Sequence, residues 1–213
     1  MFPLAVLYSG FQLDEVQWQP VNSDTLAQPV YSAYLKSAVC PMTRGVVGTR
    51  NLNTVLQQLI NLPLAGKAEI TRGGIILRVG DRVIQKKNDY NREVFNGDMG
   101  VIAAIDLEEQ EVTVQFADRQ VSYDYADMNE ITLAWSVTVH KAQGSEYPVV
   151  ILPFYMQHYM MLNRNLLYTG LTRAKQLAIL VGTKKAIGLA VRQVKDQRRY
   201  TLLRERLMFA KSS

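Results

Sequence analysis

Hydrophobic and polar positions follow helical and strand periods in the first and last parts of the chain. In "TRNLNTVLQQLINLP", the positions Leu52, Val55, Leu56, Leu59 and Ile60 recur at helical spacing before a proline. The segment "NSDTLAQPVYSAYLKS", from residue 22, predicts an earlier helix, and "AVCPM" predicts a short strand between the two. These residues therefore predict strand, loop and helix in succession.

The same alternation returns after residue 135. "YPVVILPF" and "KQLAILVG" are apolar runs of strand length, and each is followed by a segment with helix-forming character, "RNLLYTGLTRA" and "TKKAIGLAVRQV". Buried strands that alternate with helices indicate a parallel sheet whose two faces are covered. An α/β fold is therefore expected.

Between Ala65 and Ile131 the pattern changes to short β-branched runs separated by turn residues. The turn signals lie at the spacing of β-hairpins, at Gly80-Asp81, Asn96-Gly97-Asp98 and Glu108-Glu109-Gln110. About five strands fit this segment, which predicts a small all-β barrel.

The predicted architecture is one α/β domain, over residues 37–64 and 132–191, interrupted by the barrel at residues 65–131. Such an insertion is tolerated because the entropy cost of closing a loop rises slowly with its length. Residues 1–36 are not assigned to either domain, and residues 192–213 predict a basic amphipathic helix.

Composition narrows the class of protein. The chain has 213 residues, 48% of them apolar, and a net charge of +5, which is enough apolar material for a sizeable core. The charge excess lies entirely in the tail, which would pack on the α/β domain, bind phosphate or contact a partner. With one cysteine, Cys40, and two histidines, there is no internal disulfide and no zinc-ligand cluster. We expect Cys40 to be buried.

No apolar run reaches the length of a membrane span, and the first residues lack the pattern of a signal peptide. A cytoplasmic protein without membrane contact is therefore expected.

The stretch "WSVTVHKAQGSEYPVVI", residues 135–151, is a candidate for phosphate or nucleic-acid contact. A glycine turn with backbone N–H groups, a hydroxyl, an imidazole and an ammonium nearby suits a polyanion, and two of its polar side chains can accept hydrogen bonds from a sugar hydroxyl. Solvated Gly-Ser turns have similar composition, so this stretch alone leaves both interpretations open. The candidate residues are Thr138, His140, Lys141, Gln143, Gly144 and Glu146.

A second candidate site is "NLLYTGLTRAKQLAILVG", residues 165–182. Arg173 lies at the end of a predicted helix and just before a buried strand, where its planar guanidinium can reach a phosphate at the sheet edge. Thr169, Thr172 and Lys175 lie close by. Cations at this place also complement the helix carboxyl end without any ligand.

Taken in this order and spacing, the two stretches closely resemble motifs V and VI of superfamily 1 helicases, particularly the RecD-like branch. "VCPMTRGVVGTRNLNTVLQQLIN" is similar to the motif IV region, and the predicted barrel to the SH3-like insertion of that family. The resemblance covers residues 39–191. It implies a RecA-like parallel-sheet domain of the P-loop NTPase type, equivalent to a UvrD-type helicase C-terminal domain.

The resemblance implies roles at the nucleotide. Arg173 would reach the γ-phosphate of ATP as an arginine finger. Gln143, Gly144 and Glu146 would lie on the nucleotide side, with Glu146 towards the ribose, and Lys141 would serve either side. Arg44, in the motif IV region, would also approach phosphate. The implied cofactor is ATP with Mg²⁺ in the full helicase, with no tight binding by this chain alone and no metal ligand in it.

The resemblance also implies contacts with single-stranded DNA. Thr138 and His140 would face its phosphates, together with Lys141 and Thr172. The barrel itself contains a mixture of cations and aromatic side chains, which can track a nucleic-acid backbone and stack bases. These residues are Lys86, Lys87, Tyr90, Arg92, Phe95, Tyr123 and Tyr125. Solvated strands carry the same residue types, so both interpretations of the barrel stay open.

A phosphate loop of the form G-x-x-x-x-G-K-[ST] does not occur in the sequence. "NLPLAGKA" departs from it at both ends, and Asp14-Glu15 has no phosphate loop before it. We therefore expect the C-terminal module of a DNA-repair helicase, whose partner is a first RecA-like domain bearing the phosphate loop, in a longer parent or a separate protein. Alone, the chain should not hydrolyse ATP. The alternative is a non-enzymatic nucleic-acid-binding or regulatory protein descended from a helicase.

Overall fold

The computed structural model describes residues 4–8, 17–20 and 38–194 of the chain. The helix expected from residue 22, the Asp14-Glu15 segment and all but the first three residues of the expected basic tail lie outside these ranges. Within them, no helix is long and apolar enough to cross a membrane.

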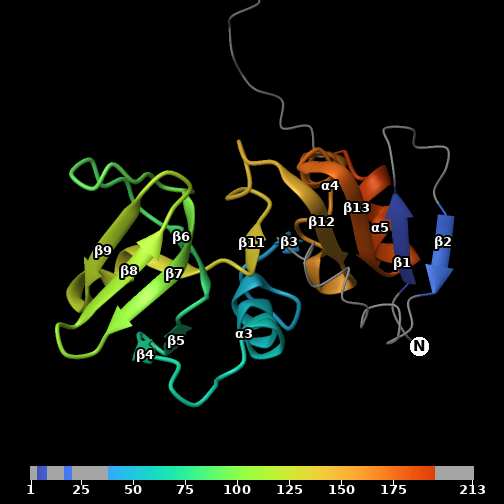
Figure 1. Ribbon diagram of the computed structural model, residues 1–213. Helices are drawn as coiled ribbons and strands as arrows, with labels where there is room; N and C mark the ends of the chain where they lie inside the picture. The colour runs from blue at the N-terminus through green and yellow to red at the C-terminus, as the bar shows by residue number, and fades with distance from the viewer. Residues whose placement is uncertain (1–3, 9–16, 21–37, 195–213) are drawn as a thin grey trace, which may run out of the picture.

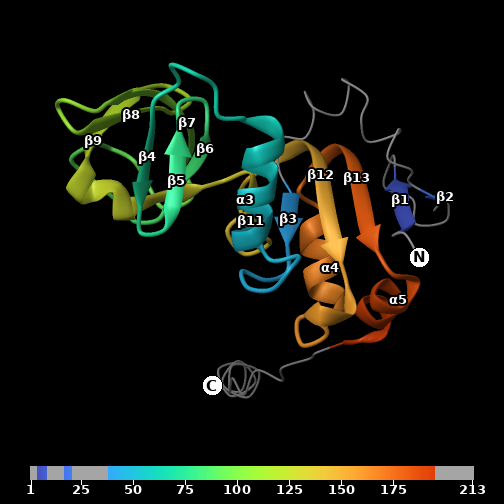
Figure 2. The ribbon, with the colours of Figure 1, turned by 90° about the horizontal axis from the view of Figure 1, so that it is seen from below.

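A six-stranded sheet forms the α/β part of the molecule, in the order β11-β3-β12-β13-β1-β2 (Figure 1). Its first four strands are parallel, as the alternating pattern predicts. The helices α4 and α5 contact each other and lie beside β12 and β13, and α3 packs beside β11 (Figure 2). The elements are β3 (Ala38–Cys40), α3 (Thr49–Ile60), β11 (Ser136–Thr138), β12 (Tyr147–Phe154), η2 (Met156–His158), α4 (Arg164–Leu171), β13 (Ala174–Gly182) and α5 (Lys184–Arg192).

An antiparallel hairpin extends this sheet beyond β13. Strand β1 (Leu4–Tyr8) pairs antiparallel with β13, from Leu4 opposite Gly182 to Tyr8 opposite Ala178, and β2 (Gln17–Pro20) pairs with β1. The sequence patterns did not predict these two strands. The pairing covers the edge of β13, which would otherwise expose a row of backbone donors and acceptors.

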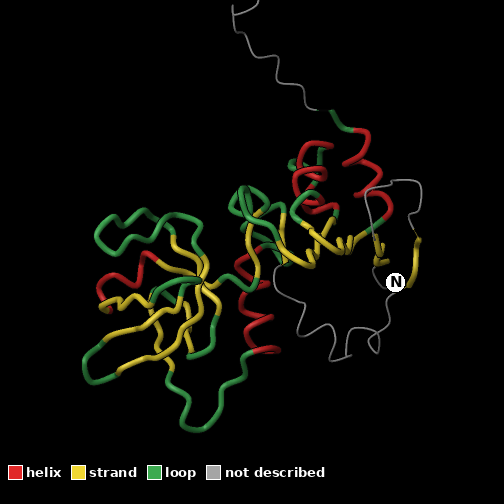
Figure 3. Tube along the Cα trace, turned by 45° about the horizontal axis from the view of Figure 1, so that its top comes forward, coloured by secondary structure: helices red, strands yellow, loops and turns green. Residues whose placement is uncertain are grey.

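The segment between α3 and β11 forms the β insertion, drawn mainly in yellow and green in Figure 3. It contains a five-stranded antiparallel sheet, β10-β6-β7-β8-β9, and the hairpin β4-β5. The predicted α/β architecture, a parallel sheet interrupted by a small β insertion, is confirmed. The strands are β4 (Glu69–Arg72), β5 (Ile75–Arg78), β6 (Arg82–Gln85), β7 (Met99–Asp106), β8 (Glu111–Gln115), β9 (Gln120–Asp124) and β10 (Ile131–Leu133), with the short helix η1 (Tyr125–Glu130) between the last two.

Of the predicted hairpin turns in the insertion, the one at Gly80-Asp81 does not join a pair of strands. Glu108-Glu109-Gln110 joins β7 and β8, which pair as a hairpin. The expectation of a hairpin at Gly80-Asp81 is wrong, because β5 pairs with β4 and β6 pairs with β7 and β10. Gly80 instead donates from its backbone N–H to the carbonyl of Ile102 at 2.7 Å, and its φ of +87° suits glycine. The chain thus changes sheets at this point.

Helix α3 forms where its periodicity predicts, but it buries its polar stripe. Thr49, Asn53 and Gln57 are buried, whereas Leu59 is 71% exposed. The amide of Asn53 donates to the carbonyl of Ser136 and accepts from its backbone N–H, at 3.0 and 2.7 Å. Polar side chains face inward because α3 lies against backbone groups that need hydrogen-bond partners.

The insertion is attached to the α/β part by polar and apolar contacts. The buried carboxylate of Asp81 accepts hydrogen bonds from the side chains of Gln57 and Asn61 on the α3 side and from the indole N–H of Trp135. Ile84 of β6 belongs to the core of the α/β part, and Met99 packs against it. These contacts fix how the insertion sits on the sheet.

Candidate nucleic-acid and nucleotide interface

The polar stretch after β11 folds as a turn between two parallel strands. The carbonyl of Thr138, at the end of β11, accepts from the backbone N–H of Ala142 at 2.9 Å, and its hydroxyl accepts from the N–H of Lys141 at 3.2 Å. Gly144 has a φ of +84°, a conformation that side-chain-bearing residues rarely adopt. A turn, and not a helix, therefore carries the candidate residues of this stretch.

This turn runs from the carboxyl ends of the parallel strands to their amino ends. These two ends are called here the first and the second edge of the sheet. Because β11 and β12 both run parallel to β3, the carboxyl end of β11 and the amino end of β12 lie at opposite edges. Thr138 lies at the first edge, level with Cys40, and Glu146 lies at the second, directly before Tyr147. The sequence motif thus supplies residues to two different places.

A cleft of about 520 Å³ lies where α3, the β4-β5 hairpin, β6 and the end of β11 meet. Three of the residues predicted to contact nucleic acid line it: Thr138, Lys141 and Lys86. Its wall is formed by residues from four distant parts of the chain. They are Thr43, Thr49, Arg50, Asn53, Thr54, Gln57, Gln58, Gly73, Gly74, Ile75, Ile76, Arg78, Ile84, Lys86, Thr132, Leu133, Ser136, Val137, Thr138 and Lys141.

The cleft is basic. Its lining includes Arg50, Arg78, Lys86 and Lys141, and none of the lining residues is acidic. Desolvation by the surrounding protein lowers the pKa of Lys141, and the positive charge of Lys86 lowers it further. Arg78 forms an ion pair with Glu69 at 2.6 Å, so the other three cations supply the field. Cations gathered in a concave surface attract a polyanion such as nucleic acid.

Arg173 lies at the opposite edge, between α4 and β13. Its Nη1 donates to the carbonyl of Ser145 at 3.1 Å, its Nε to the carbonyl of Thr169 at 3.3 Å, and its Nη2 to the hydroxyl of Thr172 at 3.5 Å. The Arg173 carbonyl in turn accepts from the N–H of Tyr147 at 2.8 Å. Among the residues that the structure describes, no carboxylate pairs with this guanidinium. Neutral oxygen acceptors therefore hold the guanidinium in position.

Beside Arg173, Glu146 forms an ion pair with Lys175 at 3.0 Å. Both side chains are more than half exposed, 59% and 58%, so the pair contributes little to stability. It nevertheless joins the second half of the turn to β13. The two predicted nucleotide-side residues, Glu146 and Arg173, are thus brought to one edge of the sheet.

The remaining predicted residues divide between the two edges. Thr172 caps the carboxyl end of α4 and lies with Arg173, not with the cleft. Arg44 is exposed in the turn that follows β3, at the edge of Thr138 and away from Arg173. His140 and Gln143 are exposed on the turn between the edges, and Lys87 is exposed beside Lys86.

Sequence patterns did not point to Arg50, Asn53 or Gln57 as lining residues. On an isolated helix their positions are typical of a solvent-facing side, and the cleft forms only when the insertion packs beside α3. The only local signal was that Thr49, Asn53 and Gln57 recur every four positions on the side opposite the apolar residues.

Comparison with known proteins identifies the class to which this fold belongs. Residues 52–116 match the ATP-dependent RecD-like DNA helicase SH3 domain, and residues 133–181 match the UvrD-like helicase C-terminal domain. The fold therefore corresponds to the C-terminal RecA-like region of a superfamily 1 helicase with its SH3-like insertion.

Two individual relatives show which helicases the chain resembles. The chain is 39% identical over 163 residues to the ATP-dependent RecD2 DNA helicase of Deinococcus radiodurans, over 76% of this chain and 22% of that protein. It is 32% identical over 115 residues to the RecBCD enzyme subunit RecD of Haemophilus influenzae, over 54% of this chain and 17% of that protein. The chain thus spans about a fifth of these relatives. It is homologous to the C-terminal region of RecD-like DNA helicases.

The crystal structure of Pif1 helicase from Bacteroides in complex with ADP-AlF3 and ssDNA has the same fold. It superposes with a TM-score of 0.52 at 17% identity, over 91% of this chain and 51% of that chain. The resemblance to a RecD-like helicase, first seen in the two polar stretches, is confirmed.

Proposed function

We propose that this chain is the C-terminal module of a RecD-like ATP-dependent DNA helicase. It binds single-stranded DNA in the basic cleft and supplies Arg173 to an ATP site completed by a first RecA-like domain. The RecD2 relative is described as an ATP-dependent DNA helicase, and the Pif1 structure of the same fold contains ssDNA and ADP-AlF3.

We place the domain boundaries at residues 37–64 and 132–191 for the RecA-like domain and 65–131 for the insertion.

One observation carries the proposal. The turn after β11 begins at the basic cleft, with Thr138 and Lys141, and ends where Ser145 and Glu146 contact Arg173 and Lys175. Displacement of this turn by a bound strand therefore acts directly on the partner of the Arg173 guanidinium. A motor needs such a connection between its two ligands.

Arg173 fits the developing charge of a phosphoryl group. Its planar guanidinium is permanently charged and is positioned by neutral acceptors, so its charge is available to an anion. Glu146, at the same edge, can accept from a ribose hydroxyl once it leaves Lys175. The phosphate loop of the first domain would hold ATP and its Mg²⁺, and ATP itself supplies the phosphoanhydride bond that is cleaved. This chain positions the arginine.

Binding of DNA is tested by fluorescence anisotropy with a labelled oligothymidylate. The unmodified chain should bind it, and Lys141→Ala should weaken binding by about fivefold, since one charged contact contributes roughly 1 kcal/mol. Lys185→Ala, an exposed lysine on α5, is the matched control and should leave binding unchanged. Equal affinities for the unmodified and Lys141→Ala chains would contradict the assignment of the cleft.

A second candidate function is a non-enzymatic nucleic-acid-binding or regulatory protein. This alternative differs from the helicase proposal in the role of Arg173, which would then contact no nucleotide phosphate. Mixing the chain with a separately produced first RecA-like domain of a RecD-like helicase should give DNA-stimulated ATP hydrolysis if the helicase proposal holds. The chain alone should stay at the rate of buffer, and no activity in the mixture would favour the regulatory alternative.

A further inference from the structure

The loop between β6 and β7, residues 86–98, carries two aromatic side chains at the surface. Tyr90 is 76% exposed and Phe95 is 44% exposed. Their ring centroids lie 6.0 Å apart with an interplanar angle of 75°, an edge-to-face arrangement. Both rings thus keep part of their apolar surface open to a ligand.

The loop is held in one conformation by its own hydrogen bonds. Asp89 and Val94 exchange two backbone hydrogen bonds, at 2.7 and 3.0 Å. The Asp89 carboxylate accepts from the backbone N–H of Asn91 at 2.9 Å and forms an ion pair with Arg92, which also pairs with Asp127. The two aromatic rings therefore stand on a framework that is ordered before any ligand binds, which lowers the entropy cost of binding.

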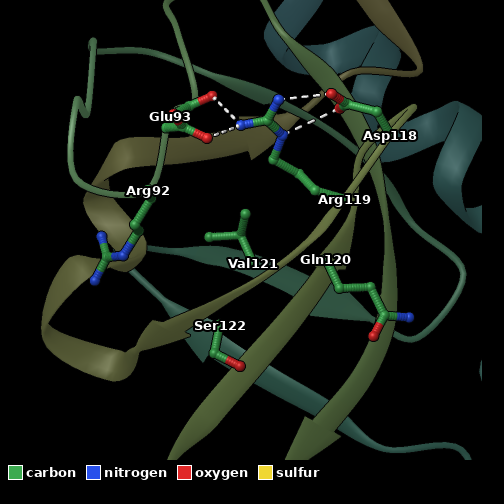
Figure 4. Close-up of a pocket in the computed structure, with 7 residues that line it drawn as sticks. All are labelled: Arg92, Glu93, Asp118, Arg119, Gln120, Val121 and Ser122. Carbon is green, nitrogen blue, oxygen red and sulfur yellow. Dashed lines mark hydrogen bonds and ion pairs between the residues drawn. The ribbon is translucent and has the colours of Figure 1, made fainter.

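A second brace holds the loop from the β8-β9 turn. Arg119 donates to the carbonyl of Glu93 at 3.2 Å and to its carboxylate at 2.8 Å, and it pairs with Asp118 at 2.6 Å. Figure 4 shows its guanidinium between these two acids, beside a shallow hollow of about 410 Å³. Through these contacts Arg119 ties the loop to the β8-β9 turn.

The loop starts at the basic cleft. Lys86 lines the cleft close to Lys141, and Lys87 is exposed directly after it. Tyr90 lies four residues further, so its Cα is at most ~14 Å from that of Lys86. In Figures 1 and 3 the loop and the turn after β11 rise on the same side of the molecule. A strand leaving the cleft past the two lysines therefore meets the aromatic pair.

We infer that Tyr90 and Phe95 form a stacking platform for an unpaired base of the single strand held in the cleft. This inference rests on the proposed function. Alternating cations and aromatic faces are the chemistry by which proteins hold single strands, the cations along the phosphates and the rings against the bases. The neighbouring lysines favour a nucleic acid over an apolar protein surface as the occupant.

The test compares two oligonucleotides of the same length, about ten nucleotides, with the full 213-residue chain. One is oligothymidylate, and the other carries the same phosphates and sugars with abasic positions throughout. Tyr90→Ala combined with Phe95→Ala should weaken binding of oligothymidylate by more than about fivefold, the loss that ~1 kcal/mol or more of stacking gives. Binding of the abasic strand should be unchanged, and Tyr90→Phe should keep the affinity.

Tyr159→Ala, which removes an exposed tyrosine of the α/β part, is the control for aromatic loss elsewhere. Unchanged affinity for oligothymidylate in the double variant, with Lys141→Ala still weakening it, overturns the platform and leaves the cleft assignment intact. An equal loss on both strands also overturns it, since bases would then have no part. Absence of binding to either strand contradicts the proposed function and the platform together. Circular dichroism and thermal melting establish that each variant is folded.

Discussion

The guanidinium of Arg173 donates to the carbonyl of Ser145 across 3.1 Å, and the two residues are 28 positions apart. This contact joins the end of α4 to the turn that begins at the basic cleft. A displacement of that turn would therefore remove one of the acceptors that hold the Arg173 guanidinium.

Replacement of Arg173 by lysine should abolish ATP hydrolysis by the chain combined with a phosphate-loop domain, lowering kcat by about a thousandfold or more. Lysine keeps the charge but loses the fork that contacts Ser145 and Thr169 together. Steady-state release of phosphate with saturating DNA measures the effect. A kcat within a few-fold of the unmodified mixture would show that Arg173 does not act on the phosphate.

Salt dependence separates a phosphate contact from a structural one at Lys141 and Lys86. Each lysine that neutralises a phosphate of a single strand contributes about 0.7 to the slope of log affinity against log salt concentration. Lys141→Ala and Lys86→Ala should each reduce the slope by about that amount, and the double variant by about twice as much. Lys185→Ala should leave the slope as it is. Unchanged slopes in all variants would place the strand elsewhere.

Asp81 holds the insertion on α3, and its loss should destabilise the fold. Asp81→Ala removes the acceptor of the Trp135 indole N–H and of the Arg78 backbone N–H, both buried. The amides of Gln57 and Asn61 lose one acceptor each and keep the backbone carbonyls of Ile76 and Val79. The free energy of unfolding should fall by roughly 2–4 kcal/mol, because each buried donor without a partner costs about 1–3 kcal/mol. Urea denaturation measures this, with Asp124→Ala, at an exposed position, as the control.

Cys40 should react with thiol reagents only after unfolding. Its side chain is fully buried, its sulfur lies 3.1 Å from the Ser136 hydroxyl, and burial raises its pKa to about 11. The native thiol is therefore protonated at neutral pH. Since the unfolded thiol ionises near pH 9, the contribution of Cys40 to stability should decline as pH rises from about 9 through 11. Labelling in native buffer as fast as in urea would contradict this burial.

Two glycine substitutions should have opposite signs. Gly144→Ala forces a side chain into the left-handed region at φ +84° and should lower the free energy of unfolding by about 1–2 kcal/mol. Gly188→Ala, inside α5 with open space around the added methyl group, should raise it by about 0.5–1 kcal/mol. A stabilising Gly144→Ala would mean that the turn adopts another conformation.

Local sequence patterns predicted the parts of the fold that depend on local order. The runs around Val150 and Leu180 are long and apolar enough to specify buried parallel strands, and Arg173 follows from its place between helix and strand. The hairpin of β1 and β2 was not predicted. Strand β1, "LAVLY", is a short apolar run, but its pairing with β13 joins distant parts of the chain and leaves no local signal.

The cleft was beyond local patterns for a different reason. Arg50, Gly73, Lys86 and Thr138 come together only through the packing of the insertion against α3. The periodicity of α3 also favoured the wrong face for burial. Asn53 and Gln57 are buried because they bond to the backbone of Ser136 and Ile76, and these partners are distant in the sequence.

The two hydrogen bonds between the side chain of Asn53 and the backbone of Ser136 bear on how the molecule behaves among copies of itself. Strand β11 ends the sheet, and an open edge invites a strand from another chain to pair with it. A single amide side chain occupies the donor and acceptor that such a strand would use. Asn53 therefore blocks the backbone positions through which a strand of a second chain would extend the sheet.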